Sequence, residues 1–239
     1  MEWSAEGLII GVKRHGESAL ILETMVPGRG RWQGLVRGGR SPKQAAFLQP
    51  GNSVHLVWRA RLEDHLGHFS VEATHLRAAA MLADRQKLYL IQLLGDHLRL
   101  LPERDPHDDL LAAVFDLIDR ERGQEELGMD LARFEMFLLE ELGFGLDLDT
   151  CAVTGSHENL THVSPRSGRA VCATEAGPYG DRLLALPAFL GADVSCGAGD
   201  IGAAFRLTGH FLDRHVWAAR RMEPPSTRDW LIQHLQNPA

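Results

Sequence analysis

The chain has 239 residues, of which 44% are hydrophobic and 24% are charged, and its formal net charge is −7. This composition is typical of a globular protein with one large domain or two ordinary ones. Three cysteines exclude a disulfide framework, and no window approaches the roughly 18 uninterrupted apolar residues of a membrane span. The N-terminal residues lack the pattern of a signal peptide, so we expect a cytoplasmic protein.

Residues 1–80 have the pattern of a small β-barrel. The polar residues 15–17 form a hairpin turn between the first two strands, and later strands are separated by Gly-bearing turns. The expected strands cover residues 8–12, 19–24, 31–37, 54–60 and 67–73. Five short strands in this arrangement predict an OB-fold, and an SH3-like barrel fits nearly as well.

The barrel region contains a basic stretch without carboxylates. No Asp or Glu occurs between Glu23 and Glu63, although the whole chain is acidic. The cations in this stretch are Arg29, Arg31, Arg37, Arg40, Lys43, Arg59 and Arg61. Excluding carboxylates favours an anionic partner, because each carboxylate would repel the partner and cancel a neighbouring arginine.

Residues 28–43 are the candidate nucleic-acid contact. Arginine forks bind phosphate bidentately, and glycines let the backbone approach a phosphodiester closely. The candidate DNA-binding residues are Arg29, Arg31, Arg37, Arg40, Lys43, Arg14 and Lys13. Trp32 fits either stacking on an unpaired base or the barrel core, and the core is favoured. An ordinary solvated hairpin is the alternative interpretation of the whole segment.

From residue 78 the hydrophobic period becomes helical. We expect a long helix from 78 to Pro102, and further helices from about 108, across 131–142, at 183–190, at 201–220 and at 226–235. Residues 147–180 lose this period and form an irregular insert. The fold class is therefore α+β, with a helical domain at 81–239 that carries a net charge of −10.

The insert contains a candidate metal site that is incomplete. Cys151 and Cys172 are each followed three positions later by a residue other than cysteine, namely Thr154 and Glu175. A structural zinc site needs four ligands, usually as two close pairs. His157 and His162 could complete a Cys2His2 site, but two buried cysteines without a metal are the favoured interpretation.

No segment carries a recognisable catalytic or nucleotide-hydrolysing motif. A P-loop, Gly-x-Ser-x-Gly and His-Glu-x-x-His are all absent, and the glycines at 28–34 lack dinucleotide-binding spacing. We therefore expect a protein that is not an enzyme and has no catalytic residue. A carboxylate-dependent nucleic-acid enzyme remains an alternative, as does a scaffold that binds an acidic protein or RNA through its barrel.

Several motifs, in this order, resemble the RecO family of bacterial DNA repair and recombination-mediator proteins. They lie at residues 11–24, 28–43 and 48–51 in the first part of the chain, and at 133–151, 163–172 and 183–190 in the second. The first includes Gly-Val-Lys-Arg-His-Gly-Glu-Ser-Ala-Leu, and the fourth includes Glu-Leu-Gly-Phe-Gly-Leu-Asp-Leu-Asp-Thr-Cys.

The resemblance implies an N-terminal OB-fold, a helical domain and a zinc-finger-like insert. It implies a non-enzymatic protein of the nucleoid that binds single- and double-stranded DNA, anneals complementary strands and contacts the C-terminal tail of the protein SSB. With RecR it would help to load RecA onto gaps. Zinc-bearing members have two Cys-x-x-Cys pairs in the insert; this chain keeps only Cys151 and Cys172, so we expect no cofactor. Candidate cations for the SSB tail are Arg206, Arg214, Arg220 and Arg221.

Overall fold

A computed structural model describes residues 1–191 and 198–236 of the chain. The chain divides into two compact units, Met1–Ile118 and Asp119–Ala239. The boundary expected between residues 80 and 81 lies within helix α2 (Ala78–Leu82), and its role as a domain boundary stays a prediction. Among the described helices, none is long and apolar enough to cross a membrane.

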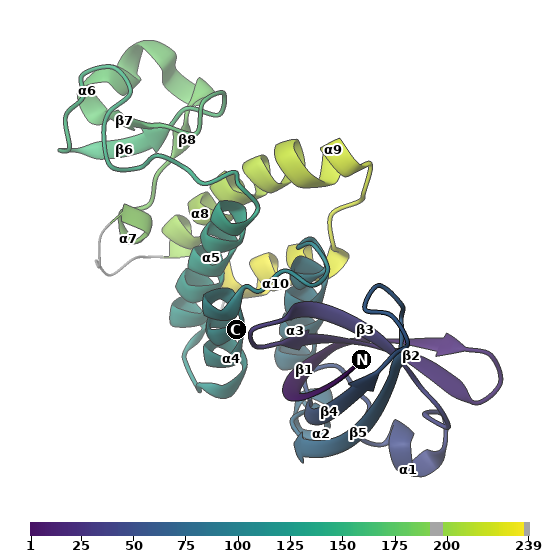
Figure 1. Cartoon of the computed structure of the whole chain (residues 1–239). Coiled ribbons are helices and arrows are strands. Elements are labelled where there is room, and N and C mark those ends of the chain that lie inside the picture. The colour runs from purple at the N-terminus through teal and green to yellow at the C-terminus, as the bar shows by residue number, and fades with distance from the viewer. Residues whose placement is uncertain (192–197, 237–239) are drawn as a thin grey trace. The chain divides into compact units, whose positions relative to one another are not determined.

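The first unit contains a closed five-stranded barrel (Figure 1). Its strands are β1 (Glu2–His15), β2 (Ala19–Val26), β3 (Gly30–Val36), β4 (Ser53–Arg59) and β5 (His68–His75). They close in the order β1-β2-β3-β5-β4, and β3 meets β5 in parallel at Leu35 and His68. This arrangement confirms the OB-fold prediction, although β1 begins well before the expected residue 8.

Trp32 belongs to the barrel core. Alternate residues of β3 point inward, and Trp32 is only 4% exposed. Its ring lies edge-on to Trp3 at 5.2 Å and to Trp58 at 5.3 Å between centroids. The favoured prediction for Trp32 is therefore confirmed, and its ring is not free to stack on a base.

Four helices accompany the barrel in this unit: α1 (Pro42–Ala45), α2, α3 (Arg85–Leu98) and α4 (Asp108–Asp119). The prediction of one continuous helix from residue 78 was wrong. Asp84 adopts an extended backbone conformation between α2 and α3, and its carboxylate accepts hydrogen bonds from the backbone N–H groups of Gln86 at 2.9 Å and Lys87 at 3.3 Å. Asp84 therefore ends one helix and caps the next.

Helix α3 packs closely on β1 because two glycines leave space between them. A Cβ atom on Gly95 would lie 2.9 Å from the carbonyl oxygen of Ile10. A Cβ atom on Gly11 would collide with the guanidinium of Arg99, which follows α3. The space beside Gly11 allows Arg99 to donate a hydrogen bond to Ile10 O.

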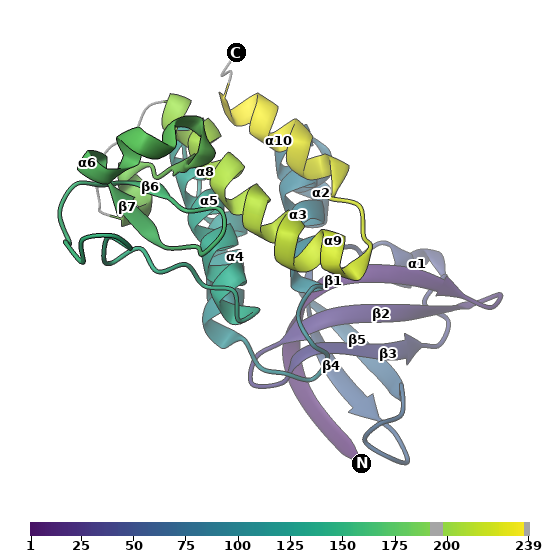
Figure 2. The ribbon, with the colours of Figure 1, turned by 90° about the horizontal axis from the view of Figure 1, so that it is seen from above.

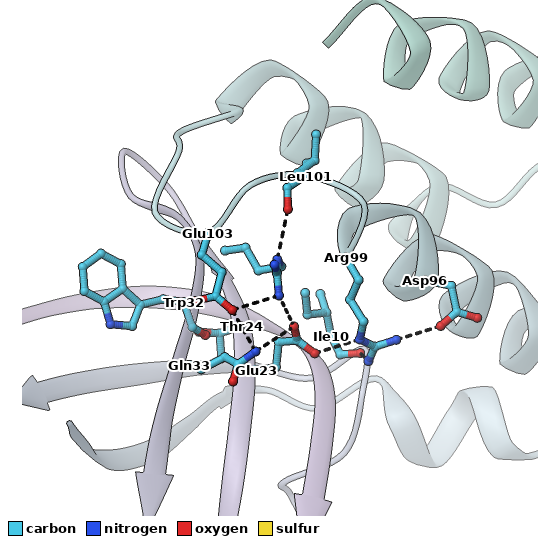
Figure 3. Close-up of polar contacts among 10 residues, drawn as sticks. Ile10, Glu23, Thr24, Trp32, Gln33, Asp96, Arg99, Leu101 and Glu103 are labelled. Carbon is cyan, nitrogen blue, oxygen red and sulfur yellow. Dashed lines mark hydrogen bonds and ion pairs between the residues drawn. The ribbon is translucent and has the colours of Figure 1, made fainter. Parts of the chain in front are cut away.

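The Glu23 carboxylate joins the barrel to the end of α3 (Figure 3). Its two oxygens accept hydrogen bonds from Arg31 Nη1 and Arg99 Nε, each at 2.7 Å. The Glu23 side chain is 13% exposed. Burial raises the pKa of Glu23, but the hydrogen bonds from Arg99 and Arg31 outweigh burial, so this pKa lies below its ordinary value. One carboxylate thus connects β2, β3 and α3.

The second unit is built on helices that surround a buried ion pair. The helices are α5 (Gln124–Glu141), α8 (Ala198–Leu212), the π-helical turn η2 (Asp213–Trp217), α9 (Ala218–Arg220) and α10 (Ser226–Gln236). Arg228 of α10 donates from Nε and Nη2 to the two oxygens of Glu135 on α5, at 2.7 and 2.8 Å. The hydroxyl of Thr208 on α8 also donates to Glu135, which is 0% exposed.

The insert between α5 and α8 is more regular than expected. It contains β6 (Leu160–Val163), β7 (Ala170–Cys172), α6 (Ala173–Ala176), the 3-10 turn η1 (Gly177–Arg182), β8 (Leu184–Ala185) and α7 (Ala188–Gly191). The strands form a sheet in the order β7-β6-β8. Two of them, β6 and β7, are antiparallel neighbours (Figure 2). The helix expected at 183–190 forms only at its end, as α7, and was wrong for residues 183–187: Leu184–Ala185 is strand β8, and Leu186 N–H bonds to Thr161 O at 2.9 Å. Pro187 would interrupt a helix at this point.

We predict that Glu23→Gln lowers the free energy of unfolding by about 2 kcal/mol at pH 7, because Arg31 and Arg99 lose their shared carboxylate. The folded-state pKa of Glu23 lies below 4.5, so its stabilisation is present above pH 4.5 and is lost as the pH falls further. In urea unfolding, the difference from wild type should shrink between pH 7 and pH 3. Glu17→Gln, in an exposed turn, is the control; a pH-independent difference for Glu23→Gln would contradict the prediction.

We predict that Arg228→Met lowers the free energy of unfolding by about 3 kcal/mol, because the buried Glu135 carboxylate loses its ion pair with Arg228. Replacing both residues by methionine removes the buried carboxylate as well, so the double variant should be more stable than Arg228→Met alone. Thermal and urea denaturation measure both effects. A double variant no more stable than the single variant would show that the charge left behind is not the cause.

Candidate nucleic-acid interface

The basic stretch of the sequence meets carboxylates in the folded unit. The connection between α3 and α4 runs along the β2–β3 hairpin, and Arg104 N–H bonds to Arg31 O at 2.9 Å. Glu103 on this connection lies 3.3 Å from Arg31 Nη1. At the hairpin turn, Gly28 N–H donates to Asp108 Oδ1 at 2.7 Å. Residues 28–33 are therefore partly covered by an acidic segment from elsewhere in the chain.

Arg31 and Arg29 take part in contacts within the unit. The Arg31 side chain is 14% exposed, and its guanidinium lies between Glu23 and Glu103 and donates from Nε to Leu101 O at 3.3 Å. The Arg29 guanidinium lies over the Trp3 ring at 4.6 Å. These contacts give both residues structural roles, and their predicted contacts with DNA stay predictions.

The part of the stretch after β3 is open. Arg37, Arg40 and Lys43 are all exposed. Arg40 N–H donates to Ser18 O at 3.1 Å, and its Nη1 donates to Gly16 O at 3.2 Å. These hydrogen bonds hold the turn after β3 beside the β1–β2 turn, so cations from separate segments are brought together.

A first groove lies between this turn and the β1–β2 hairpin. It has a volume of about 370 Å³, and its lining residues are Val12, Arg14, Leu20, Arg40, Ala45, Leu48 and Gln49. Arg14 and Arg40, which are both predicted site residues, therefore face the same space. In the described part of the chain, no carboxylate lines this groove.

A second groove is formed by residues of the segment that follows β3 together with residues of β4 and β5. It has a volume of about 490 Å³, and its lining residues are Val36, Arg37, Gln44, Arg59, His68, Phe69, Ser70 and Val71. We call it the His68 groove. Arg37 Nη2 lies 3.1 Å from His68 Nε2, and Arg59 Nη2 lies 2.8 Å from Glu2 Oε1. Among described residues, its lining also contains no carboxylate.

Sequence reasoning missed His68 and did not select Arg59 as a site residue. The two residues face each other only because β4 and β5 pair in a register that places Arg59 opposite His68. No local pattern around either residue indicates this meeting. The acid-free composition around Arg59 was the one available signal.

Lys13 lies in a mixed environment. It is exposed, and it lines a space of about 320 Å³ with Glu23, Gln33 and Arg99 among its neighbours. The predicted residues thus fall into three groups. Arg14, Arg37, Arg40 and Lys43 are open, Lys13 lies near a carboxylate, and Arg29 and Arg31 make internal contacts.

The open cations can hold the backbone of a nucleic acid without reading its sequence. Phosphate contacts from arginine and lysine position a strand, whereas base contacts specify its sequence. The two grooves present guanidinium groups from four positions along the barrel, Arg14, Arg37, Arg40 and Arg59.

Cys151 and Cys172 of the insert are both buried in one small apolar core. Cys172 N–H donates to Cys151 Sγ at 3.3 Å. The Thr154 hydroxyl and the backbone N–H groups of Cys172, Thr154 and Val153 lower the pKa of the Cys151 thiol to about 6. The sulfur of Cys172 lies 3.2 Å from Thr174 Oγ1 and 3.9 Å from Thr154 Oγ1. Two threonine hydroxyl groups therefore lie near the Cys172 sulfur.

These residues do not fit a four-ligand zinc site. His157 Nδ1 bonds to Asp149 O at 2.9 Å, and His162 Nδ1 bonds to Thr161 Oγ1 at 2.9 Å. Within residues 1–191 and 198–236, no group of three or more His, Cys, Asp or Glu side chains is placed to hold a metal ion. Two sulfurs alone do not satisfy the tetrahedral coordination of structural zinc.

Comparison with known families covers nearly the whole chain. A family model described as Recombination protein O N terminal matches residues 1–77, and one described as Recombination protein O C terminal matches residues 82–222. DNA repair protein RecO of Sinorhizobium medicae is 49% identical over 233 residues, which cover 97% of this chain and 94% of the relative. DNA repair protein RecO of Agrobacterium fabrum is 48% identical over 235 residues, which cover 98% and 92%.

A third relative, DNA repair protein RecO of Mesorhizobium japonicum, is 49% identical over 238 residues, which cover 99% of this chain and 94% of the relative. Both family models match in the expected order, and each relative is matched over most of its own length. The resemblance found in the sequence motifs is thereby confirmed. This chain, with its OB-fold barrel and helical second unit, belongs to the RecO family of DNA repair proteins.

Proposed function

We propose that this chain binds single- and double-stranded DNA through the two grooves of its barrel and acts as a recombination mediator. The observation that carries the proposal is the set of exposed arginines, Arg14, Arg37, Arg40 and Arg59, in grooves that lack carboxylates in their described linings; the Arg59 guanidinium also pairs with Glu2. Phosphodiester strands are the anionic partners expected for a DNA repair protein. Binding through phosphates is independent of sequence, which a mediator at random gaps requires.

Strand annealing follows from the same charges without a catalytic residue. Two complementary strands repel each other, and cations that neutralise both strands together remove part of that repulsion. The proposed role is therefore non-enzymatic. Because the proposed partner is chromosomal DNA, we expect the protein at the nucleoid, in the cytoplasm.

The proposed partners are RecR and SSB, and through them RecA, which the protein would help to load onto SSB-coated DNA. An acidic SSB tail needs cations outside the DNA grooves. All four candidate arginines, Arg206, Arg214, Arg220 and Arg221, are exposed in the second unit, and Arg214 Nη1 donates to Pro165 O at 2.5 Å. They stay the candidates for contact with the tail.

We predict that the affinity for a labelled oligo(dT) strand falls with salt. If the exposed cations Lys13, Arg14, Arg37, Arg40 and Lys43 each neutralise one phosphate, log K falls against log salt with a slope of roughly −3.5. Replacing Arg37 or Arg40 by alanine should each reduce the steepness by about 0.7 and weaken all sequences alike. Fluorescence anisotropy at several salt concentrations measures the slope.

The matched control is Arg182→Ala, which removes an exposed arginine of the second unit and should leave the slope unchanged. Absence of binding, or an affinity that does not depend on salt, would contradict the proposal. Loss of one protein partner with unchanged oligonucleotide binding in the Arg37 and Arg40 variants would instead favour an interaction scaffold. Turnover of DNA or RNA that depends on Mg²⁺ would favour an enzyme.

We also propose that the insert is metal-free and held by packing around Cys151 and Cys172. Metal analysis of the purified chain should find substoichiometric zinc. The variant with Thr154→Cys and Glu175→Cys supplies two further sulfurs in the Cys-x-x-Cys spacing and should retain zinc, which shows that the assay detects a completed site. One equivalent of zinc in the unaltered chain would contradict the proposal.

A further inference from the structure

The His68 groove contains an arginine and a histidine in direct contact. Arg37 Nη2 lies 3.1 Å from His68 Nε2, and both side chains are exposed. A guanidinium can only donate hydrogen bonds, so His68 Nε2 is the acceptor and carries no proton in this arrangement.

The charged surroundings of His68 come from several elements. Arg37 follows β3, Arg59 lies opposite His68 on β4, and Glu2 of β1 pairs with Arg59 at 2.8 Å. The hydrogen bond from Arg59 lowers the pKa of Glu2, so this carboxylate stays ionised throughout the neutral range. The connection that precedes His68 also carries Glu63, Asp64 and His65, all exposed.

An anion in this groove changes the preferred protonation of His68. A phosphate that binds Arg37 competes with His68 Nε2 for the same guanidinium donors. Once that hydrogen bond is lost, a protonated His68 can donate from Nε2 to a phosphate oxygen, and the negative charge favours this form. Histidine is the side chain that makes this change between pH 5 and 8.

We propose that the His68 groove is a proton-coupled phosphate subsite, in which binding of a DNA backbone phosphate beside Arg37 is accompanied by proton uptake at His68. This inference rests on the proposed DNA binding and adds a residue and a regulation to it. The volume of about 490 Å³ lies in the range of ligand sites, so there is room for part of a nucleotide as well as its phosphate. Because linkage is reciprocal, the subsite binds DNA more tightly as the pH falls.

The test compares the full-length chain with His68→Gln, which keeps a polar side chain at this position but cannot take up the proton. Binding of labelled oligo(dT) is followed by anisotropy from pH 8 to pH 6 at constant ionic strength. The wild-type affinity should rise by roughly three- to tenfold more than that of His68→Gln, within the limit of about a hundredfold that one linked proton sets over two pH units. His75→Gln, which removes an exposed histidine at the other end of β5, should behave as wild type.

Calorimetry in two buffers of different ionisation enthalpy gives the proton count directly. Wild type and His75→Gln should take up more protons on binding oligo(dT) near pH 7 than His68→Gln does. Equal proton counts and equal pH profiles for all three proteins, with DNA binding retained, would overturn the subsite and leave the proposed function standing.

Two further outcomes would also count against the subsite. If none of the proteins binds oligo(dT), the proposed function fails and the subsite fails with it. If a polyglutamate peptide, but not oligo(dT), produces proton uptake that depends on His68, the groove is a site for acidic protein rather than for DNA. Circular dichroism of each variant confirms that the exposed substitutions leave the fold intact.

Discussion

The paired hydrogen bonds of Glu23 with Arg31 and Arg99 are the constraint on which the first unit depends. They connect two barrel strands to the end of α3 through one carboxylate that is largely removed from water. The position of α3 then sets the path of the connection that follows it along the β2–β3 hairpin. This path delivers Glu103 and Asp108 to the hairpin, and so determines which cations of the basic stretch remain open.

The two halves of the basic stretch consequently lie in different environments. Its first half, around Arg29 and Arg31, makes internal contacts with aromatic rings and carboxylates. Its second half, from Arg37 to Lys43, stays exposed and separates two grooves lined by arginines. A continuous run of cations in the sequence thus becomes an anchored hairpin and an adjoining cationic surface. Arg37, Arg40 and Lys43 of this second half are proposed DNA contacts, together with Lys13 and Arg14 of β1 and Arg59 of β4.

The barrel, the α+β class and the family could be predicted from the sequence, because alternation, turn residues and ordered motifs are local signals. Contacts between segments that lie far apart in the sequence could not be predicted in this way. The carboxylates that cover Arg31 come from Glu23 and from Glu103, some 70 residues later, and the contact of Arg37 with His68 depends on strand pairing. The break at Asp84 and the strand before Pro187 also had local signals, in a capping residue and a proline, that the helical period concealed.

The division of the basic stretch is tested most directly by comparing Arg31→Ala with Arg37→Ala in one pair of measurements, thermal denaturation and the salt dependence of oligo(dT) binding. Arg31→Ala should lower the melting temperature and leave the salt slope of the folded protein unchanged, because its guanidinium is held by Glu23 and Glu103. Arg37→Ala should leave the melting temperature unchanged and make the slope less steep by about 0.7. An Arg31 variant that keeps wild-type stability but loses DNA affinity would contradict this account.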